Sequence, residues 1–221
     1  MHQSVENLIL VKNKIKEIIE KKQLKTDPNI IAVSKTFPIN EITPLLDSGH
    51  IHFGENKIQE AELKWSLLKN KYKNLKLHMI GNLQSNKAKK AVKLFDYIHS
   101  LDNIKLALKL NHYQKELNKK IDIFIQVNLA EESQKSGILL NELKDFYDYC
   151  TKELSLNIIG LMCLPPALSH SDEYFKILRK ASDKLALDNL SMGMSGDYEA
   201  AIENKSNFLR LGTLIFGNRS S

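Results

Sequence analysis

Ile121-Asp122-Ile123-Phe124-Ile125-Gln126-Val127 is the clearest β-strand in the sequence. The run is short and mostly apolar, as expected for a strand buried in a sheet. A helical pattern precedes it over 102–118, and a second one follows over 138–152. Parallel neighbouring strands require a crossover of this length, usually an α-helix. The region therefore predicts a parallel strand between two crossover helices.

Further strand and helix patterns alternate in both directions from this strand. Strands are predicted at 30–34, 50–54, 75–80, 96–99, 121–127, 157–163, 188–192 and 208–211. Helices are predicted before and between them, at 4–24, 39–48, 55–70, 83–93, 102–118, 138–152, 169–187 and 195–204. Eight such units within 221 residues favour a closed (β/α)8 TIM-type barrel over an open sheet. No composition shift or linker divides the chain, so residues 1–221 are expected to form a single domain.

Composition and charge narrow the class of protein. Hydrophobic residues make up 43% and charged residues 26%, the usual globular balance. The net charge of +6 raises the possibility of a nucleic-acid partner. However, the lysines are spread along helical stretches, and no basic run is interleaved with aromatic residues that could stack on bases. A solvated lysine surface is therefore favoured, and no nucleic-acid partner is expected.

Membrane and secretion signals are missing from the sequence as well. The best apolar run, 158–168, is too short to cross a bilayer and is broken by Pro165 and Pro166. The first six residues have an acid where a secretion signal needs a basic segment. Cys150 and Cys163 are the only cysteines, too few for a disulfide scaffold. A cytoplasmic protein without a membrane partner is expected.

The first predicted strand ends in Ser34-Lys35-Thr36. In a barrel of this kind the functional residues lie at the carboxyl ends of the strands. Burial beside the core lowers the pKa of an ammonium group, which makes the amine a nucleophile toward carbonyl compounds. Lys35 is therefore a candidate nucleophile. The alternative is an ordinary lysine whose charged end reaches solvent from the end of a strand.

The seventh and eighth predicted strands end in polar and glycine-containing segments. Ser195 and Gly196 follow the seventh strand, and Gly212 and Thr213 follow the eighth. Barrel enzymes often hold a phosphate group between these two loops, where a hydroxyl and free backbone N–H groups can bind it. The alternative for Ser195 is a helix cap. Arg210 is one of only three arginines, and we expect it to contact a buried ligand.

Four histidines, His50, His52, His78 and His99, pose the question of a metal site. No pair of them has the helical spacing of a ligand couple, and neither cysteine has a partner at ligand spacing. Histidines of the core or the rim are the favoured interpretation. No metal is expected.

Several segments, in order from about residue 30 to residue 219, together form a family pattern. They are Ala32-Val33-Ser34-Lys35-Thr36, Phe53-Gly54-Glu55-Asn56-Lys57-Ile58-Gln59-Glu60, His78-Met79-Ile80-Gly81-Asn82-Leu83-Gln84-Ser85-Asn86-Lys87, Gln134-Lys135-Ser136-Gly137, Gly160-Leu161-Met162, Ser191-Met192-Gly193-Met194-Ser195, and Arg210-Leu211-Gly212-Thr213 with Phe216-Gly217. This pattern resembles the YggS/PROSC family of pyridoxal phosphate homeostasis proteins. The resemblance implies a barrel like the N-terminal domain of alanine racemase.

The resemblance also implies a cofactor, pyridoxal 5′-phosphate (PLP), and a set of residues that bind it. Lys35 would hold it as an internal aldimine. Ser195, Gly212 and Thr213 would bind its phosphate, Arg210 would face its pyridine nitrogen, and Asn56 would lie near its ring. These are the cofactor-binding residues we expect, and no catalytic residue is assigned.

Two positions depart from the family pattern. Asn82 stands where the family usually has proline, so a looser loop is expected there. The turn before the last strand is Lys205-Ser206-Asn207, without the glycine of the family, and Asn204 is expected to take the left-handed conformation in its place.

The expected role follows from the chemistry of Arg210. PLP enzymes draw electrons into a protonated pyridine ring, and an arginine cannot supply that proton. Racemisation also needs a second base on the opposite face of the substrate, and a single barrel domain is expected to lack one. We therefore expect a monomeric carrier that buffers PLP or delivers it to PLP-dependent apo-enzymes, with little or no turnover. The alternatives are a small amino-acid racemase or decarboxylase that uses Lys35 as its base, and a basic RNA-binding barrel.

Overall fold

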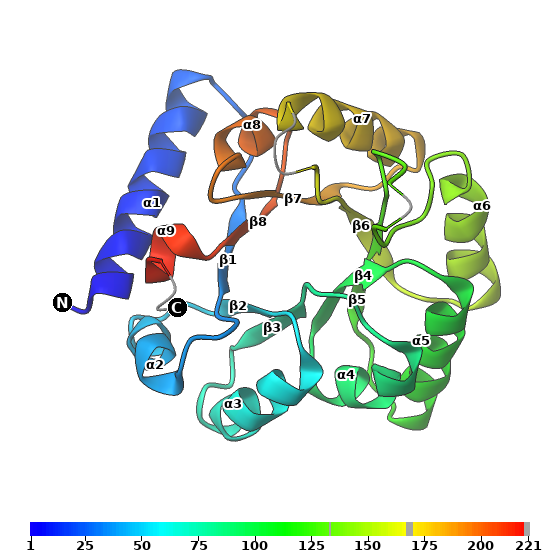
Figure 1. Cartoon of the computed structure of the whole chain (residues 1–221), viewed down its shortest axis with the longest axis horizontal. Helices are drawn as coiled ribbons and strands as arrows, with labels where there is room; N and C mark the ends of the chain where they lie inside the picture. Colours follow the sequence, from blue (N-terminus) through cyan, green and yellow to red (C-terminus); the bar gives the residue numbers. More distant parts are fainter. Residues whose placement is uncertain (133, 167–169, 219–221) are drawn as a thin grey trace.

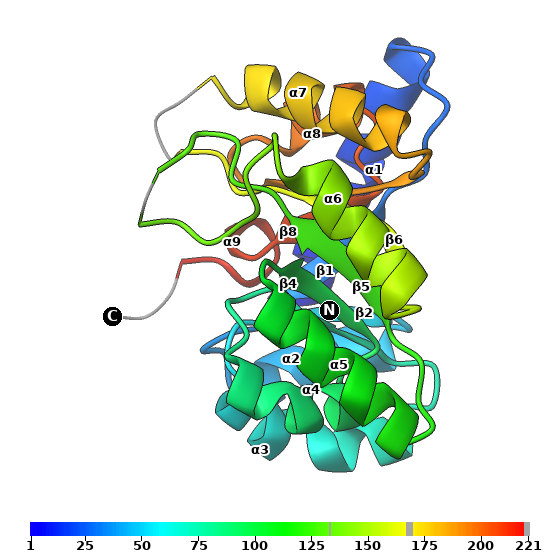
Figure 2. The ribbon, with the colours of Figure 1, turned by 90° about the vertical axis from the view of Figure 1, so that its right-hand side faces the viewer.

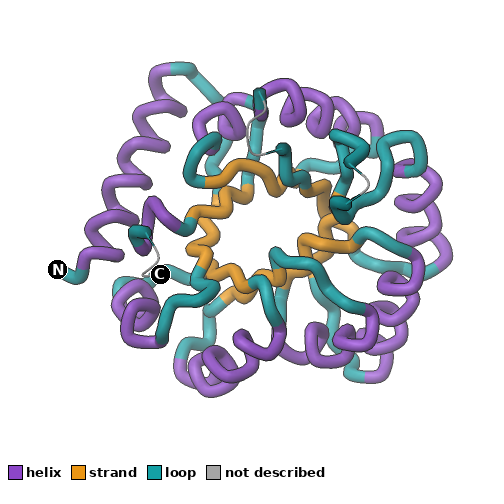
Figure 3. The backbone as a smooth tube through the Cα atoms, viewed as in Figure 1, coloured by secondary structure: helices purple, strands orange, loops and turns teal. Residues whose placement is uncertain are grey.

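A computed structural model of the chain describes residues 1–132, 134–166 and 170–218. Within these residues, parallel strands close into a barrel in the order β1-β2-β3-β4-β5-β6-β7-β8, with the helices arranged outside it (Figures 1 and 3). The strands are β1 (Asn29–Val33), β2 (His52–Glu55), β3 (Lys76–Met79), β4 (Tyr97–Leu101), β5 (Asp122–Gln126), β6 (Ile158–Met162), β7 (Asn189–Met194) and β8 (Phe208–Leu211). The predicted (β/α)8 barrel is confirmed.

Helices cover the outside of this barrel. They are α1 (Gln3–Lys21), α2 (Ile39–Asp47), α3 (Ile58–Lys71), α4 (Ala88–Leu94), α5 (Ile104–Glu116), α6 (Leu143–Asp148), α7 (Ser171–Lys184), α8 (Tyr198–Glu203) and α9 (Thr213–Phe216), with a 3-10 turn η1 (Ser85–Lys87) and a π-helical turn η2 (Tyr149–Glu153). None of the helices in the described part of the chain has both the length and the apolar character needed to span a bilayer.

Apolar side chains fill two separate regions. Between the sheet and the helices, Phe53 of β2 packs on Trp65 of α3 with ring centroids 5.0 Å apart. A smaller cluster, composed of Ile31, Phe124, Met162 and Phe208, comes from β1, β5, β6 and β8. Because β1 and β5 are not neighbours, only the barrel interior can bring these side chains together. The interior is therefore packed, and a ligand has room only at an end of the barrel.

The carboxyl ends of the strands face one side of the molecule. In Figure 2 the described parts of the segment between β5 and α6 project on the left of the barrel. Lys35, Asn56, Ser195, Gly212 and Thr213 follow strands at this end, the usual location of barrel active sites, and Arg210 lies near the end of β8.

The predicted helix over 138–152 is wrong in its first part, because α6 begins only at Leu143. Ile138 pairs with the end of β5: its N–H donates to the Gln126 carbonyl and its own carbonyl accepts from Asn128 N–H, both at 2.9 Å. Gly137 turns the chain with a φ of 133°. Of the predicted helix 169–187, residue 169 lies outside the described residues, and α7 covers Ser171–Lys184.

Candidate functional site

Four neighbouring strands, β7, β8, β1 and β2, carry the predicted site residues at one end of the barrel. β1 and β8 pair in register at Ala32 and Leu211, and β1 and β2 pair at Val33 and Gly54. Lys35 lies just beyond β1, between Gly212 beyond β8 and Asn56 beyond β2. The register thus brings these three residues to adjacent strand ends.

The loops after β7 and β8 meet at Ser195. Gly212 is the N-cap of α9, Thr213 is its first residue, and Leu214 N–H donates to Ser195 Oγ at 3.4 Å. The first N–H groups of a helix have no partner within the helix. An ideal Cβ placed on Gly196 would meet no described atom within 4 Å, so the space beside Ser195 is open. A hydroxyl and backbone N–H groups at such a place form a donor set suited to an anion.

Ser195 is not the N-cap of α8, the helix that follows it, so that alternative is wrong for α8. β7 continues to Met194, with an irregular register between Ser191 and Met194, and α8 begins at Tyr198. Asp197 occupies the N-cap position, and its Oδ1 accepts from Met194 N–H at 2.6 Å. This tight turn leaves Ser195 turned toward α9.

Arg210 is a buried cation that contacts neutral groups. Its side chain is 4% exposed. Nη1 donates to Ser191 Oγ at 2.7 Å, and Nη2 donates to the Cys163 carbonyl at 2.8 Å. Within the described part of the chain it forms no ion pair. Burial lowers the pKa of Arg210, but a guanidinium group remains protonated in proteins. A buried charge without a carboxylate is suited to a ligand that supplies an acceptor.

A clamp from α3, composed of Glu60 and Lys64, holds the loop that carries Lys35. Lys64 Nζ donates to the Ser34 carbonyl at 2.8 Å, and Glu60 Oε1 accepts from Thr36 N–H at 2.5 Å. Thr36 has a left-handed φ of 68°, an uncommon conformation for a β-branched residue. The clamp fixes the backbone on both sides of Lys35.

Glu55 anchors the clamp from inside the protein. Its carboxylate lies 2.7 Å from Lys64 Nζ and accepts from Ser34 Oγ at 2.8 Å and Trp65 Nε1 at 3.0 Å. Burial raises the pKa of Glu55, and the bonds from Lys64 oppose that rise. The sequence patterns did not reveal the ion pair of Glu55 and Lys64. The i, i+4 spacing of Glu60 and Lys64 was the one local signal, and it is common on solvated helices.

A polar cavity of about 350 Å³ extends the site toward β5 and β6. Asn56, Gln126 and Asn128 line it, and its volume is within the range of small-molecule sites. The Asn56 backbone is packed tightly, because a Cβ on Gly81 would lie 2.4 Å from the Asn56 carbonyl oxygen. Asn56 therefore has a fixed place on the rim.

The structure shows how the chain accommodates the two departures from the family pattern, at Asn82 and in the turn before β8. Asn82 Nδ2 donates to Ser136 Oγ at 2.6 Å, so the loop expected to be looser has a side-chain hydrogen bond. The expectation for Asn204 is wrong, since its φ is −93°. Lys205, at the position of the missing glycine, takes the left-handed conformation with a φ of 65°.

The four histidines lie in the core or at its rim, as predicted. His50, His78 and His99 are buried, and His52 is partly buried. Over the residues that the structure describes, no three His, Cys, Asp or Glu side chains are placed to hold a metal ion. His52, His78 and His99 instead contact one another in the barrel interior. The sequence analysis missed this contact, although the three residues lie on consecutive strands.

Comparison with known proteins first defines the class of this barrel. A family model described as the alanine racemase N-terminal domain matches residues 10–220. An alanine racemase from Clostridium difficile 630 is similar in fold, with a TM-score of 0.73 and 18% identity, covering 99% of this chain and 57% of that chain. At this identity the likeness concerns the fold alone.

Closer relatives identify the family. A pyridoxal phosphate homeostasis protein from Synechocystis is 43% identical over 86% of this chain and 91% of its own length. A protein of the same name from Pasteurella multocida is 34% identical over 97% of both chains. The protein belongs to the family of pyridoxal phosphate homeostasis proteins. The structure of PipY from Synechococcus elongatus with PLP bound matches with a TM-score of 0.80 and 32% identity, over 92% of this chain and 100% of that chain.

Proposed function

We propose that this protein binds pyridoxal 5′-phosphate and serves in PLP homeostasis as a carrier rather than as an enzyme. The observation that carries the proposal is Arg210, a buried guanidinium that contacts neutral oxygen atoms at the end of the barrel where Lys35 lies. The names of the relatives and the PLP-bound structure of PipY support the identity of the ligand.

The residues at the barrel mouth fit this cofactor in their chemistry. Ser195, Gly212 and Thr213 offer a hydroxyl and backbone N–H groups for a phosphate. Lys35 supplies the amine that joins reversibly to an aldehyde. Arg210 offers N–H donors to a ring nitrogen, and Asn56 lies on the rim of the adjoining cavity.

The same residues restrict catalysis. Bound PLP stabilises carbanions by drawing electrons into its ring, and it does so best when the ring nitrogen is protonated. Arg210 keeps its own proton, so it donates a hydrogen bond to that nitrogen without protonating it. We therefore expect the protein to hold the aldehyde in masked form and to convert amino acids slowly or not at all.

The biological setting belongs to the same proposal. The chain acts as one domain over residues 1–221 and as a monomer in the cytoplasm, and PLP-dependent apo-enzymes receive the cofactor. Cys150 and Cys163 are both buried and unpaired, so the proposed cytoplasmic setting requires no disulfide. Burial raises the pKa of each thiol to about 12, which makes both sulfur atoms unreactive.

Reductive trapping tests the covalent link. Protein incubated with PLP is treated with borohydride and mapped by peptide mass spectrometry, and the pyridoxyl group is expected on Lys35. Lys35→Ala is expected to lose the absorbance of the bound cofactor while its circular dichroism stays native. Lys57→Ala, a change of an exposed lysine just beyond Asn56, is the matched control and should keep both. Labelling of another lysine, or none, would contradict the assignment.

Turnover separates the carrier from the enzyme. The PLP-loaded protein is assayed against a panel of amino acids for racemisation and decarboxylation. We expect rates well below the common enzyme range of about 1 s⁻¹ and above. A rate within that range for any amino acid would establish a racemase or decarboxylase in place of the carrier.

A further inference from the structure

An unbroken row of hydrogen bonds crosses the interior of the barrel and ends on Arg210. His52 Nδ1 lies 2.9 Å from His78 Nε2, and His78 Nδ1 lies 2.9 Å from His99 Nε2. His99 Nδ1 lies 2.8 Å from Ser191 Oγ, which accepts from Arg210 at 2.7 Å. The row joins β2, β3, β4, β7 and β8. We call the four side chains that lead to Arg210, those of His52, His78, His99 and Ser191, the histidine row.

Aromatic stacking fixes the planes of two of the three imidazole rings. His78 stacks on Tyr97 with ring centroids 4.3 Å apart and an interplanar angle of 10°. His99 stacks on Phe124 at the same centroid distance and an angle of 18°. Rings held in this way cannot turn to find other partners, so the hydrogen bonds at their edges have one available geometry.

The direction of every hydrogen bond in the row follows from Arg210. A guanidinium only donates, so Ser191 Oγ must accept from it. The Ser191 hydroxyl proton then needs an acceptor, and among the described residues His99 Nδ1 is the one within reach. A neutral imidazole has one N–H, so His99 Nε2 donates to His78 Nδ1, and His78 Nε2 donates to His52 Nδ1. All three rings are thereby set in the Nε2–H tautomer.

A proton added to any ring would break this order. A protonated imidazole donates from both nitrogens, so a proton on His52 or His78 would bring two N–H groups face to face. A proton on His99 Nδ1 would leave the Ser191 hydroxyl proton without its acceptor. Burial and neighbouring positive charge also disfavour a proton on these rings. Burial is the largest cause that holds the pKa of His99 well below its usual value, and the Arg210 guanidinium is the second. The row therefore places neutral acceptors against a buried cation.

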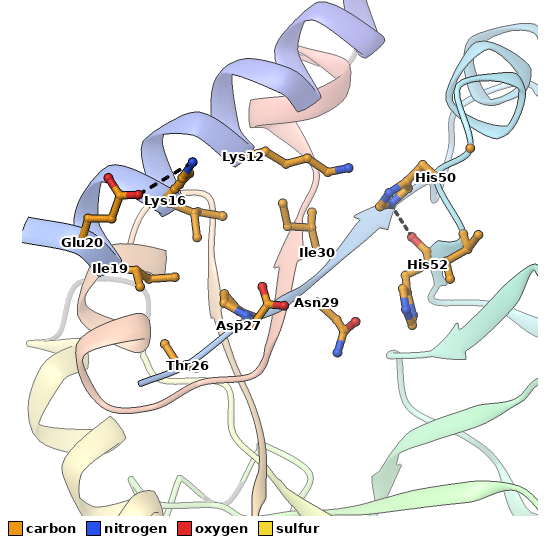
Figure 4. A pocket seen from close by; sticks show the side chains of 14 residues that line it. Lys12, Lys16, Ile19, Glu20, Thr26, Asp27, Asn29, Ile30, His50 and His52 are labelled. Carbon is orange, nitrogen blue, oxygen red and sulfur yellow. Dashed lines mark hydrogen bonds and ion pairs between the residues drawn. The ribbon is translucent and has the colours of Figure 1, made fainter. Parts of the chain in front are cut away.

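His52, the end of the row farthest from Arg210, lies at the opposite end of the barrel from the candidate site. His52 lines a cavity of about 590 Å³ together with residues that precede or begin β1 and β2, and with residues of α1 (Figure 4). His50 Nε2 contacts the His52 carbonyl at 2.9 Å and fixes the backbone there. Lys12 and Lys16 of α1 lie on the other wall of the cavity. The row thus runs from this cavity to Arg210.

We propose that His52, His78, His99 and Ser191 are positioning residues that fix the guanidinium of Arg210 for the ring of the cofactor. The proposal rests on the proposed function, because it assumes that Arg210 faces that ring. Without the row, Arg210 would keep only the Cys163 carbonyl among its described partners and could rotate about its last bonds. The row acts through Arg210 and does not itself touch the ligand.

The tautomer state tests the row in the cofactor-free protein. Two-dimensional 15N NMR of the imidazole groups at pH 7 is expected to show His52, His78 and His99 all in the Nε2–H form. The Nδ1–H form at His99 would overturn the proposal, as would a charged ring at any of the three. This readout does not depend on PLP binding, so it stays informative if the proposed function fails.

Two variants at one position test the positioning role. His99→Asn places an acceptor near the position of Nδ1, whereas His99→Gln places its polar end near Nε2 and leaves Ser191 without an acceptor. We expect the Gln variant to bind PLP about ten-fold or more weakly and to shift the absorption maximum of the bound cofactor. The Asn variant should retain the wild-type maximum and bind within about three-fold.

The controls separate positioning from folding and from the proposed function. Thermal unfolding monitored by circular dichroism shows whether each variant folds, and His112→Gln on the exposed face of α5 controls for the loss of an imidazole. Equal affinities and spectra in wild type and His99→Gln would overturn the positioning role. Absence of PLP binding by the wild type would overturn the proposed function, and the NMR result would still decide whether the row exists.

Discussion

Among the described residues, Ser195 joins two loops with one long side-chain hydrogen bond, so its contribution to the stability of the free protein is small. Leu214 N–H reaches Ser195 Oγ only at 3.4 Å, and that N–H lies in the first turn of α9. The Ser195 hydroxyl is expected to contribute more to ligand binding than to folding. A bound phosphate oxygen would accept a charge-assisted hydrogen bond from it, which is stronger than the long bond from Leu214 N–H.

Ser195→Ala is therefore expected to weaken PLP binding by about 1–3 kcal/mol and to leave the free energy of unfolding almost unchanged. Equilibrium dialysis gives the first quantity, and urea unfolding of the cofactor-free protein gives the second. Ser66→Ala is the matched control, since Ser66 is exposed on α3 and its hydroxyl donates to the Glu62 carbonyl. An affinity equal to that of the wild type would remove Ser195 from the phosphate site.

At the scale of elements, the ion pair between α3 and β2 determines where the first strand loop lies. Lys64 and Glu55 are 9% and 0% exposed, whereas the pair of Lys90 and Glu62 on the surface is 53% and 35% exposed. Removing one partner of a buried pair leaves an uncompensated charge, which costs about 3–5 kcal/mol. An exposed pair contributes about 0–1 kcal/mol.

Lys64→Met should accordingly lower the free energy of unfolding by about 3 kcal/mol or more, and Lys90→Met by less than about 1 kcal/mol. The Lys64 change should also slow the attachment of the cofactor that we propose at Lys35. The reason is that the Ser34 and Phe37 carbonyls in this loop lose the hydrogen bonds that Lys64 Nζ donates to them. Urea unfolding and stopped-flow absorbance measure the two effects. Similar losses of stability in both variants would show that Lys64 is not a clamp.

The elements that could be predicted are those that the local pattern of apolar residues determines. Short apolar runs such as 121–127 and 208–211 identify the strands, and the observed strand bounds lie within two residues of the prediction. The helix start at 138 could not be predicted, because Ile138 is drawn into a bridge with Val127 by a tertiary contact. Local patterns carry no information about such a partner.

The site shows the same division. Lys35, Ser195, Gly212 and Arg210 could be predicted as candidates because strand ends in a barrel have a known role. Glu55 and Lys64 could not, because their meeting depends on how α3 packs. The histidine row required the strand register, which places His78 opposite Tyr97 and aligns β2 with β3. Sequence alone indicated histidines of the core or the rim, without showing that they contact one another.

For the whole molecule, the neutral histidines of the interior make stability depend on pH. Burial lowers the pKa of His50 and of His52 to about 4, and the pKa values of His78 and His99 lie well below the ordinary 6.5. In the unfolded chain these four histidines bind protons near pH 6.5, whereas in the folded protein they stay neutral at that pH. The free energy of unfolding is therefore fully present above pH 6.5 and falls as the pH drops toward 4. Glu55 and Asp102 act in the opposite sense, because their pKa values are raised by burial and favour the folded state on acidification, but they are two groups against four.

The free energy of unfolding, measured with urea between pH 7.5 and pH 4.5, should thus decrease steadily below pH 6.5. For His50 alone the shift to about 4 corresponds to roughly 3 kcal/mol at the acid end. His50→Gln should retain the hydrogen bond to the His52 carbonyl and remove that share, so its curve should be flatter than that of the wild type. His112→Gln, which changes an exposed ring, should leave the slope as it is. If the wild type were equally stable at both ends of this range, the interior rings would have to accept protons without loss, and a neutral row through the barrel would be ruled out.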